Sequence, residues 1–181
     1  MSNEKLSIQV KDKEFIPYLS EETILARVKN IAVQLSEDFK DKNPVFIAVL
    51  NGSFMFAADL MKQLHINSEI TFVKLASYIG TQSSGKVLTL LGLDTNVKDR
   101  HVIIIEDIID TGFTLKKFLP VIKANEPKSI SICSLLIKPE SLQVDIKADY
   151  IGFEIPNRFV VGYGLDYDGY GRNLKSIYQL K

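Results

Sequence analysis

The chain has 181 residues, of which 46% are hydrophobic and 24% charged, and its 22 basic and 22 acidic residues give a formal net charge of zero. This length and composition predict one soluble globular domain, spanning residues 1–181, with a sizeable core. The balanced charge argues against a dedicated nucleic-acid binder, and no apolar run approaches the roughly 20 residues that cross a bilayer.

Cysteine content and the N-terminal sequence bear on the cellular compartment. The only cysteine, Cys133, cannot form an intramolecular disulfide, and its surroundings SISICSLLI predict a buried, inert thiol. The N-terminal stretch MSNEKLSIQVKDKEF lacks the apolar core of a signal peptide. We therefore expect a cytoplasmic protein without a membrane partner.

Residues 20–75 predict a helix, a strand, a second helix and a second strand, in that order. Apolar residues recur at helical spacing through 20–40, and Ser20, followed by two acids, is a candidate N-cap. The run VFIAVL at 45–50 has the length of a strand. The turn residues 51–53 interrupt it, and the helical segment 54–64 and the strand 69–75 follow.

The same order recurs further along, with a strand at 101–105, a helix at 114–124 and a strand at 128–137. Fully apolar strands that alternate with helices predict an α/β fold in which a parallel sheet is covered on both faces. Pro120 lies inside the predicted helix and should kink or shorten it. Between the two units, the Gly- and Ser-rich residues 77–86 predict either a solvated hairpin loop or a flexible active-site lid.

The stretch VIIIEDIIDTGFTL at 102–115 carries an apolar strand into three carboxylates. Glu106 and Asp107 fall at the carboxyl end of the strand, where ligands bind in open parallel sheets. Residues 111–114 lead into a helix N-terminus, whose N–H groups and dipole favour a phosphate. Since paired acids suit the two hydroxyls of a ribose and a divalent cation, the motif predicts a sugar-phosphate site. The competing interpretation is a strand and a capped helix with solvated acids.

This stretch resembles the phosphoribosyl pyrophosphate signature of the type I phosphoribosyltransferases. The segments SLLIKP at 134–139 and GFEIPNRFVVGYGLDY at 152–167, together with Arg172, resemble the 6-oxopurine branch, the hypoxanthine(-guanine) phosphoribosyltransferases. The resemblance extends through most of residues 45–172. It implies the type I phosphoribosyltransferase fold, a central parallel sheet flanked by helices, with a small hood from the chain termini and a flexible active-site loop.

The matching residues imply a ribose and phosphate site at the end of the acidic strand. Glu106 and Asp107 would hold the ribose 2′- and 3′-hydroxyls. Asp110 would also reach purine N7 and act as the general base, or proton acceptor. The 5′-phosphate would lie among Asp110, Thr111, Gly112, Phe113 and Thr114.

The resemblance also implies where the purine and the metal would bind. Lys138 would donate to the 6-oxo group, Phe159 would stack on the purine, and the backbone of Val160 would contact its pyrimidine edge. Asp166 would adjoin the purine and help the paired acids of the strand to hold Mg²⁺. Taken alone, Lys138 is typical of a solvated strand end, Phe159 of a core residue and Asp166 of a turn.

The pyrophosphate group would lie between a loop formed by Leu50, Asn51 and Gly52 and the guanidinium of Arg172, which alone could equally be a surface ion-pair partner. The family often has a strained peptide in this loop. Two positions depart from the family pattern. Asn51 stands where Lys or Arg is frequent, and Phe113 stands where many relatives have a polar or basic residue. Both changes leave the backbone N–H groups available as donors.

The implied reaction is Mg²⁺-dependent transfer of 5-phosphoribose from phosphoribosyl pyrophosphate to N9 of a 6-oxopurine, as in purine salvage. Ser77 and Tyr78 would lie on the lid that excludes water. Because the ammonium of Lys138 donates and cannot accept, an oxo group satisfies it and adenine should be rejected. We expect hypoxanthine to be used, and guanine as well, while a preference for xanthine stays open. Members of the family form dimers or tetramers, so a homo-oligomer is also implied.

Two other functions are compatible with the same fold. A regulatory branch binds RNA while sensing nucleotides, and it should carry a basic face, which the zero net charge does not favour. A catalytically silent nucleotide-binding module should have a damaged acid cluster, whereas Glu106, Asp107 and Asp110 are all present. We therefore expect an enzyme whose partners are phosphoribosyl pyrophosphate and a purine base, with no nucleic acid.

Overall fold

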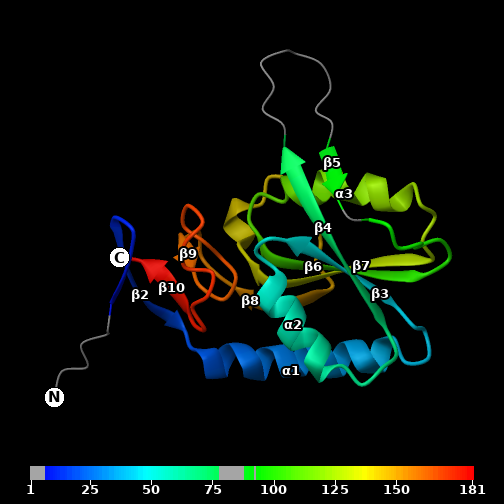
Figure 1. The fold of residues 1–181 in the computed structure, drawn as a ribbon, viewed down its shortest axis with the longest axis horizontal. Helices are drawn as coiled ribbons and strands as arrows, with labels where there is room; N and C mark the ends of the chain where they lie inside the picture. Colours follow the sequence, from blue (N-terminus) through cyan, green and yellow to red (C-terminus); the bar gives the residue numbers. More distant parts are fainter. Residues whose placement is uncertain (1–6, 78–87, 92) are drawn as a thin grey trace, which may run out of the picture.

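The computed structural model describes residues 7–77, 88–91 and 93–181. A six-stranded sheet forms the centre of the molecule, in the order β5-β4-β3-β6-β7-β8 (Figure 1). Neighbouring strands run parallel except β4 and β5, so the predicted parallel sheet is confirmed. The strands are β3 (Val45–Leu50), β4 (Glu69–Ser77), β5 (Leu88–Leu91), β6 (His101–Ile109), β7 (Ser129–Ile137) and β8 (Tyr150–Glu154).

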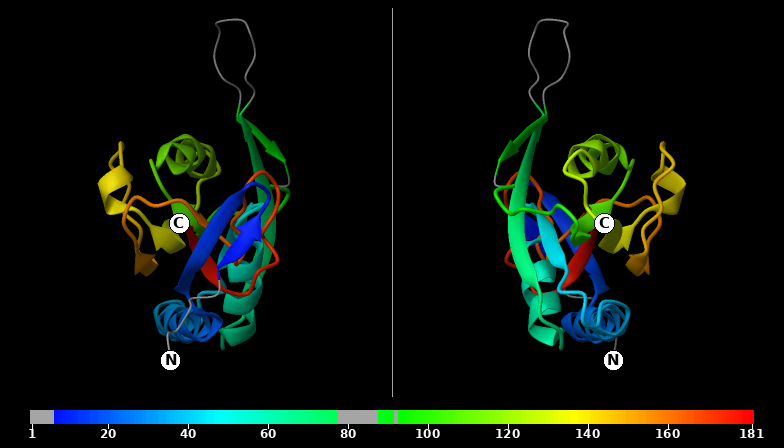
Figure 2. Two further views of the ribbon diagram at one scale, coloured as in Figure 1. Left: turned by 90° about the vertical axis from the view of Figure 1, so that its left-hand side faces the viewer. Right: turned by 90° about the vertical axis from the view of Figure 1, so that its right-hand side faces the viewer.

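Helices cover both faces of this sheet, as the sequence predicts (Figure 1, Figure 2). On one face, α1 (Glu21–Asp38) and α2 (Phe54–Gln63) pack on alternate strand residues such as Phe46 and Ile103. On the other face, α3 (Phe113–Lys123) packs on the intervening residues such as Ile47 and Ile104. Burial on both faces explains why the strands are continuously apolar. Helix α1 begins at the predicted cap, where Ser20 Oγ accepts a hydrogen bond from the N–H of residue 23 at 3.2 Å.

A second, smaller sheet is built from the two ends of the chain. It consists of β1 (Ile8–Val10), β2 (Lys13–Leu19), β9 (Val160–Val161) and β10 (Ile177–Leu180), in the order β1-β2-β10-β9. Figure 1 shows this sheet beside the central one, at the end to which the arrow of β3 points. Phe15, Val161 and Ile177 are fully buried in it. This is the hood that the resemblance implies, and it adjoins the carboxyl end of β3.

One predicted boundary is wrong, and one proline has less effect on its helix than expected. Strand β6 continues to Ile109 instead of ending at residue 105, because its pairing with β7 continues to that residue and Ile109 is again buried. Helix α3 continues through Pro120 to Lys123, one residue from its predicted end, so the proline does not shorten it. Phe118 and Ile122 on either side of the proline are fully buried, and this packing outweighs the lost backbone hydrogen bond.

Strands β4 and β5 pair antiparallel from Lys74↔Leu91 to Ser77↔Leu88, so they form the two arms of a hairpin. The residues that join the arms, 78–87, include the predicted lid residue Tyr78 and lie outside the described residues. The lid therefore stays a prediction. Within the described ranges, no helix combines the length and the apolar character that a membrane crossing requires.

Candidate active site

Glu106 and Asp107 are consecutive residues of β6 and therefore point to opposite faces of the sheet. Glu106 lines a cavity of about 80 Å³ at the N-terminus of α3, and its exposure of 5% excludes a solvated acid. Asp107 lies against the backbone of Gly52, where an added Cβ would be 1.6 Å from Asp107 Oδ2. Burial, together with the charge of Asp107, raises the pKa of Glu106 well above its ordinary value. Burial also raises the pKa of Asp107 to about 6, although nearby backbone N–H groups and Arg172 lower it.

The turn between β6 and α3 has the form of an anion site. Gly112, its central residue, has a φ of +81°, and an added Cβ would lie 2.6 Å from Val144 Cγ2, so both backbone and packing require glycine. The N–H of Gln143 supports the turn by donating to the carbonyl of Thr111 at 3.1 Å. The ring of Phe113 is 42% exposed. The 80 Å³ cavity at this helix N-terminus is lined by residues that include Asp110, Thr111, Gly112 and Thr114.

Lys138 and Asp110 are brought together at the ends of two neighbouring strands. Ile109 of β6 pairs with Ile137 of β7, so the residues that follow them lie opposite each other. Lys138 Nζ is 2.9 Å from Asp110 Oδ2. Lys138 is only 6% exposed, which excludes a solvated lysine, whereas the side chain of Asp110 is 48% exposed. The site therefore presents a donor and an acceptor side by side, next to the anion turn.

The loop between β3 and α2 reaches the hood. It contains Leu50, the last residue of β3, and the exposed Asn51, and the peptide bond between them is cis. An added Cβ at Gly164 of the hood would lie 2.0 Å from the carbonyl oxygen of Gly52. The loop is thus held between Asp107 of β6 on one side and the hood on the other.

Arg172 and Asp166 stand where the hood adjoins this loop. Arg172 donates from Nη1 to the carbonyl of Gly164 at 2.8 Å, and its Nη2 lies 2.7 Å from Asp166 Oδ1. The other oxygen of Asp166 accepts from the N–H of Gly169 at 2.6 Å. Asp166 is therefore both a turn residue and an ion-pair partner, and its pairing with Arg172 brings two predicted site residues together.

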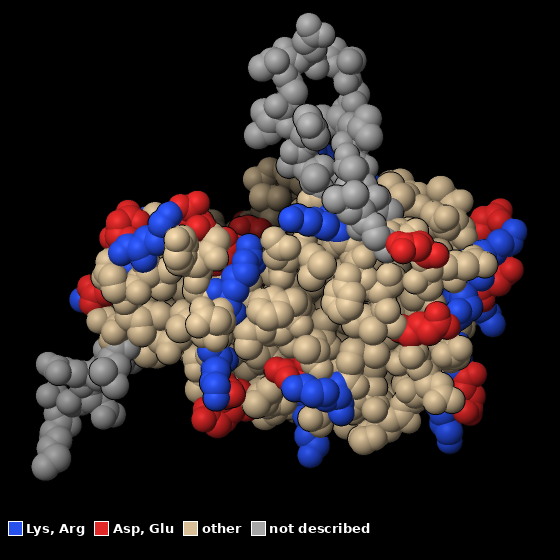
Figure 3. All heavy atoms as spheres, in the orientation of Figure 1, with Lys and Arg blue, Asp and Glu red and all other residues tan. Residues whose placement is uncertain are grey.

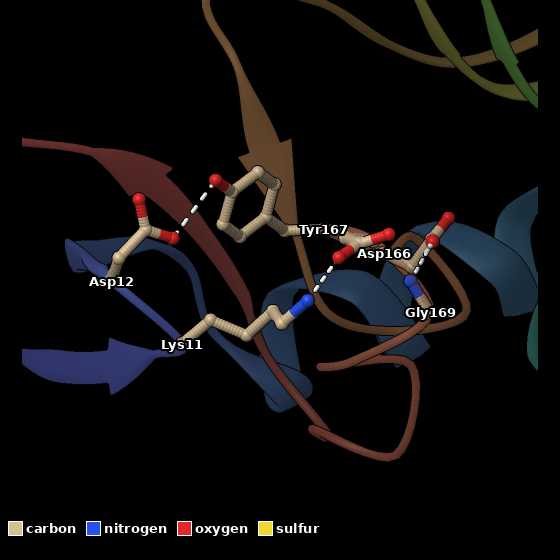
Figure 4. Close-up of polar contacts among 6 residues, drawn as sticks. Lys11, Asp12, Asp166, Tyr167 and Gly169 are labelled. Carbon is tan, nitrogen blue, oxygen red and sulfur yellow. Dashed lines mark hydrogen bonds and ion pairs between the residues drawn. The ribbon is translucent and has the colours of Figure 1, made fainter.

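The β1–β2 hairpin holds the turn that carries Asp166. Figure 4 shows Lys11 and Asp12 of the hairpin reaching toward this turn. The hydroxyl of Tyr167 donates to Asp12 Oδ1 at 2.9 Å, and Lys11 forms an ion pair with Asp168. Residues from the two ends of the chain thus hold the turn in which Asp166 lies.

Phe159 directly precedes β9 of the hood, and Val160 is the first residue of that strand. The ring of Phe159 is 43% exposed and contacts Phe15 and Tyr167, with ring-centre separations of 6.2 and 5.8 Å. Phe159 is therefore held by hood side chains and still exposes much of its surface, as a stacking platform must. Val160 is buried and pairs with Gln179 of β10.

Two contacts in this region were not predicted from the sequence. Lys13 Nζ lies 4.6 Å from the ring centre of Tyr167 and 5.7 Å from that of Phe159. The hydroxyl of Tyr163 donates to Asp59 Oδ2 at 2.7 Å. The second contact joins positions 104 residues apart, and no local pattern in the sequence signals it.

A larger hollow in the described structure is at the wrong end of the sheet for this chemistry. It has a volume of about 590 Å³ and lies before β3 and β4, at their amino ends, where it is lined by Lys40, Asp41, Asn43, Leu64, His65, Ile66 and Asn67. Ligands of open parallel sheets bind at the opposite, carboxyl ends.

Of the two predicted lid residues, Ser77 ends β4, and its side chain, like Tyr78, lies outside the described structure.

Comparisons with known proteins agree with this arrangement. The phosphoribosyl transferase domain family matches residues 18–168. A hypoxanthine-guanine phosphoribosyltransferase of Streptococcus mutans is 47% identical over 163 residues, which are 90% of this chain and 91% of that relative. The crystal structure of a hypoxanthine-guanine phosphoribosyltransferase from Bacillus anthracis has a TM-score of 0.82 and 39% identity, covering 91% of this chain and 96% of that one.

A hypoxanthine phosphoribosyl transferase of Trypanosoma cruzi is similar over a comparable length. Its structure, solved in work on the role of its C-terminal region in oligomeric state and enzymatic activity, has a TM-score of 0.85 and 35% identity. The match covers 96% of this chain and 95% of that one. By sequence and by fold, the chain belongs to the phosphoribosyl transferase domain family.

Proposed function

We propose that this chain is an enzyme of purine salvage that transfers 5-phosphoribose from phosphoribosyl pyrophosphate to N9 of hypoxanthine or guanine and releases pyrophosphate. The similarity to hypoxanthine-guanine phosphoribosyltransferases supports the reaction. The single observation that carries the proposal is the pair of the buried Lys138 and Asp110, 2.9 Å apart beside the anion turn.

This pair matches one edge of a 6-oxopurine. The ammonium of Lys138 donates to the oxygen on C6, and the carboxylate of Asp110 accepts the proton of N7. Adenine carries an amino group at C6, which would leave a buried ammonium facing a donor. Hypoxanthine, guanine and xanthine differ at C2, away from the pair, so Lys138 and Asp110 select the oxo group without ranking the three bases.

We assign the other parts of the substrate to the remaining predicted residues. We assign the ribose hydroxyls to Glu106 and Asp107, the 5′-phosphate to the turn 110–114, and the pyrophosphate group to the loop 50–52 with Arg172. N9 of the purine forms its bond to C1′ as the bond from C1′ to the pyrophosphate oxygen breaks. Positive charge develops on the sugar and negative charge on the leaving group. Arg172 and the loop N–H groups stabilise the departing anion, while Asp110 accepts the purine proton.

Mg²⁺ fits the carboxylates at this end of the sheet, where the charge of Asp166 acts on Asp107. Among the described residues, no group of three or more His, Cys, Asp or Glu side chains could hold a metal without help. Mg²⁺ usually takes one or two carboxylates and completes its shell with water and substrate phosphates. Burial raises the pKa values of both Glu106 and Asp107, so a divalent cation would offset charges that are unfavourable there. We assign it to these acids and Asp166; when bound, it would neutralise charge on the pyrophosphate group.

We further propose a cytoplasmic homo-oligomer. Ile70 and Phe72 are exposed by 36% and 43%, and alternation places them on the same face of β4. Large apolar side chains exposed in this way are typical of contacts between subunits. Light scattering at micromolar concentration should give at least twice the mass of one chain, and a monomer would contradict this part of the proposal.

The RNA-binding alternative has less support. Such a protein needs a basic face for phosphate contacts. On the face drawn in Figure 3, Lys and Arg side chains are interspersed with Asp and Glu, and the formal net charge of the chain is zero. Charges of both signs on one face do not make a surface for a nucleic-acid backbone.

The proposed function is tested by measuring pyrophosphate release with Mg²⁺ and phosphoribosyl pyrophosphate, with hypoxanthine, guanine, xanthine and adenine offered separately. We expect turnover with hypoxanthine and guanine and none above background with adenine. Turnover only with xanthine would require a different assignment of the base, and no turnover with any of the four would contradict the enzyme proposal.

A further inference from the structure

Tyr163 connects the hood to the core of the molecule. It is 1% exposed, its backbone has a φ of +51°, and its N–H donates to the carbonyl of Leu174 at 2.7 Å. Its hydroxyl leaves the hood and donates to Asp59 Oδ2 at 2.7 Å. Burial and the hydrogen bond to Asp59 raise the pKa of the phenol, so the hydroxyl keeps its proton at neutral pH. The contact is therefore a partly buried hydrogen bond to a carboxylate, a strong class of hydrogen bond.

Asp59 lies on α2, which begins directly after the loop of residues 50–53. Its second oxygen pairs with Lys62 Nζ at 2.6 Å, so both oxygens of Asp59 have partners. The start of the helix is fixed by Ser53, whose Oγ donates to the carbonyl of Val49 at 2.6 Å and whose carbonyl accepts from the N–H of Ala57 at 2.8 Å. Asp59 thus belongs to the same rigid unit as the loop that we assign to pyrophosphate.

Gly164, the residue after Tyr163, is the point at which the hood contacts the loop of residues 50–52. An added Cβ at Gly164 would lie 2.0 Å from the carbonyl oxygen of Gly52. Two hydrogen bonds also join Gly164 to Arg172. The N–H of Gly164 donates to the carbonyl of Arg172 at 3.0 Å, and the carbonyl of Gly164 accepts from Arg172 Nη1 at 2.8 Å. A shift of Tyr163 would therefore move Arg172 relative to the loop.

We propose that Tyr163 and Asp59 form a positioning pair that sets the separation between Arg172 and the loop of residues 50–52. The inference rests on the proposed function, which assigns the pyrophosphate group to these two elements. The pair acts through its neighbours, because Tyr163 is buried and Asp59 lies within α2. Lys138 and Asp110 are held by the register of β6 and β7 instead, and the ring of Phe159 is held by Phe15 and Tyr167. Loss of the pair therefore impairs use of phosphoribosyl pyrophosphate and spares the purine.

Tyr163→Phe removes the hydroxyl and leaves the ring in the core. We expect the KM for phosphoribosyl pyrophosphate to rise about tenfold and the KM for hypoxanthine to change by less than about twofold, as fits one lost hydrogen bond to a charged group. Asp59→Ala should reproduce this split. Asp59→Asn keeps an accepting oxygen and should recover most of the loss. The double variant of Tyr163→Phe with Asp59→Ala should be little worse than either alone, because both remove one bond.

Tyr150→Phe is the matched control. The hydroxyl of Tyr150 donates to Asp38 Oδ2 at 2.6 Å and ties β8 to α1, which carry none of the proposed site residues. Its loss should lower the melting temperature while both KM values stay unchanged. An equal rise in both KM values of Tyr163→Phe, no rise in either, or the same rise in Tyr150→Phe would overturn the positioning pair.

Binding of pyrophosphate with Mg²⁺, measured by calorimetry, separates this inference from the proposed function. If the unaltered protein turns over no purine, the proposed function fails. Weaker pyrophosphate binding by Tyr163→Phe than by the unaltered protein would still support the positioning pair, and unchanged binding would contradict it.

Discussion

Lys138 and Asp110 show how strand register can assemble a site from residues that look ordinary by themselves. Each follows the last residue of its strand, and the pairing of Ile109 with Ile137 sets them opposite each other. Burial of the Lys138 ammonium is costly unless a carboxylate accompanies it, and Asp110 provides one at 2.9 Å. From the sequence, this pair could be predicted only through the family resemblance, because 28 positions separate the partners.

Asp110→Asn should slow turnover while preserving the fold. The amide cannot take the purine proton, and the loss of a placed general base is typically worth ~10²–10⁴ in rate. Because the side chain of Asp110 is 48% exposed, the melting temperature should change little. Steady-state pyrophosphate release and thermal unfolding measure both. Asp145→Asn, at an exposed position of the segment after β7, is the control for loss of a negative charge, and Asp110 would have no part in proton transfer if the two variants turned over equally fast.

Asp107 should make stability depend on pH in the acid range. Its pKa is raised by burial from 3.8 to about 6, so between these values the unfolded chain releases its proton first and the folded chain keeps it. The contribution of Asp107 to the free energy of unfolding therefore falls as pH rises from about 4 to about 6, by at most about 3 kcal/mol, and does not change above that. Glu106 shifts in the same direction and adds to this fall.

Asp107→Asn tests the sign of this dependence. Denaturant unfolding in metal-free buffer should show a more stable variant at pH 7 and a shallower fall between pH 4 and 6, with activity lost because the ribose contact is gone. The matched variant Asp145→Asn should leave the pH profile unchanged. A less stable Asp107→Asn variant at pH 7 would mean that the carboxylate is favourable where it lies.

At the scale of elements, the turns between strands set the geometry of the site. Gly164 and Gly169 both have a left-handed φ, of +100° and +86°. A Cβ at Gly164 would meet the carbonyl of Gly52 at 2.0 Å, whereas a Cβ at Gly169 would meet nothing within 4 Å. A side chain at either position would therefore strain the backbone, but only a side chain at position 164 would also collide with the loop of residues 50–52.

Gly169→Ala should cost about 1–2 kcal/mol of stability from backbone strain alone and should leave turnover close to normal. Gly164→Ala should cost more and should also lower kcat/KM for phosphoribosyl pyrophosphate by ~10²-fold, since it displaces the loop by an ångström or so. Denaturant unfolding and initial rates measure the two effects. Equal losses of activity in both variants would argue that the hood and the loop are not coupled through Gly164.

Elements with a strong local signal could be predicted from the sequence, and those defined by distant partners could not. Strand β3 matches its predicted bounds, and α1 begins at its predicted cap, Ser20. The predicted strand at 101–105 is shorter than β6 because Glu106 and Asp107 interrupt the apolar run, while the pairing with β7 continues to Ile109. At such a site, pairing within the sheet overrides the low preference of charged residues for a strand.

For the whole molecule, the α/β architecture follows from the alternation of apolar strands with helices, but the hood does not. Strand β9 has two residues and β10 has four, too few to show a period. Strand β10 pairs with β9 on one side and with β2, from the far end of the chain, on the other, with an irregular register between Ile177 and Tyr178. Only the family resemblance predicted that the two termini would meet.

Arg27 is expected to hold the outer strand of the central sheet to α1. Its Nε donates to the carbonyl of Gly152 at 2.8 Å and its Nη2 to that of Ile151 at 2.5 Å, both in the edge strand β8. Arg27→Met should lower the free energy of unfolding by about 1–3 kcal/mol, because two carbonyls lose a charged donor. Turnover below the melting temperature should be unchanged. Lys29→Met, at an exposed position of the same helix, should have no such effect, and equal stabilities for the two variants would refute the role of Arg27.

The central claim, that Lys138 selects a 6-oxopurine for phosphoribosyl transfer, is tested most directly by the ratio of kcat/KM for hypoxanthine to kcat/KM for adenine. We predict a ratio of at least about 10⁴ for the unaltered protein, since a site built to hydrogen-bond one group strongly rejects an analogue without it. In Lys138→Gln, whose amide both donates and accepts, the ratio should fall by ~10²-fold or more, with the KM for phosphoribosyl pyrophosphate unchanged. Comparable use of adenine by the unaltered protein, or the same ratio in Lys138→Gln, would contradict the claim.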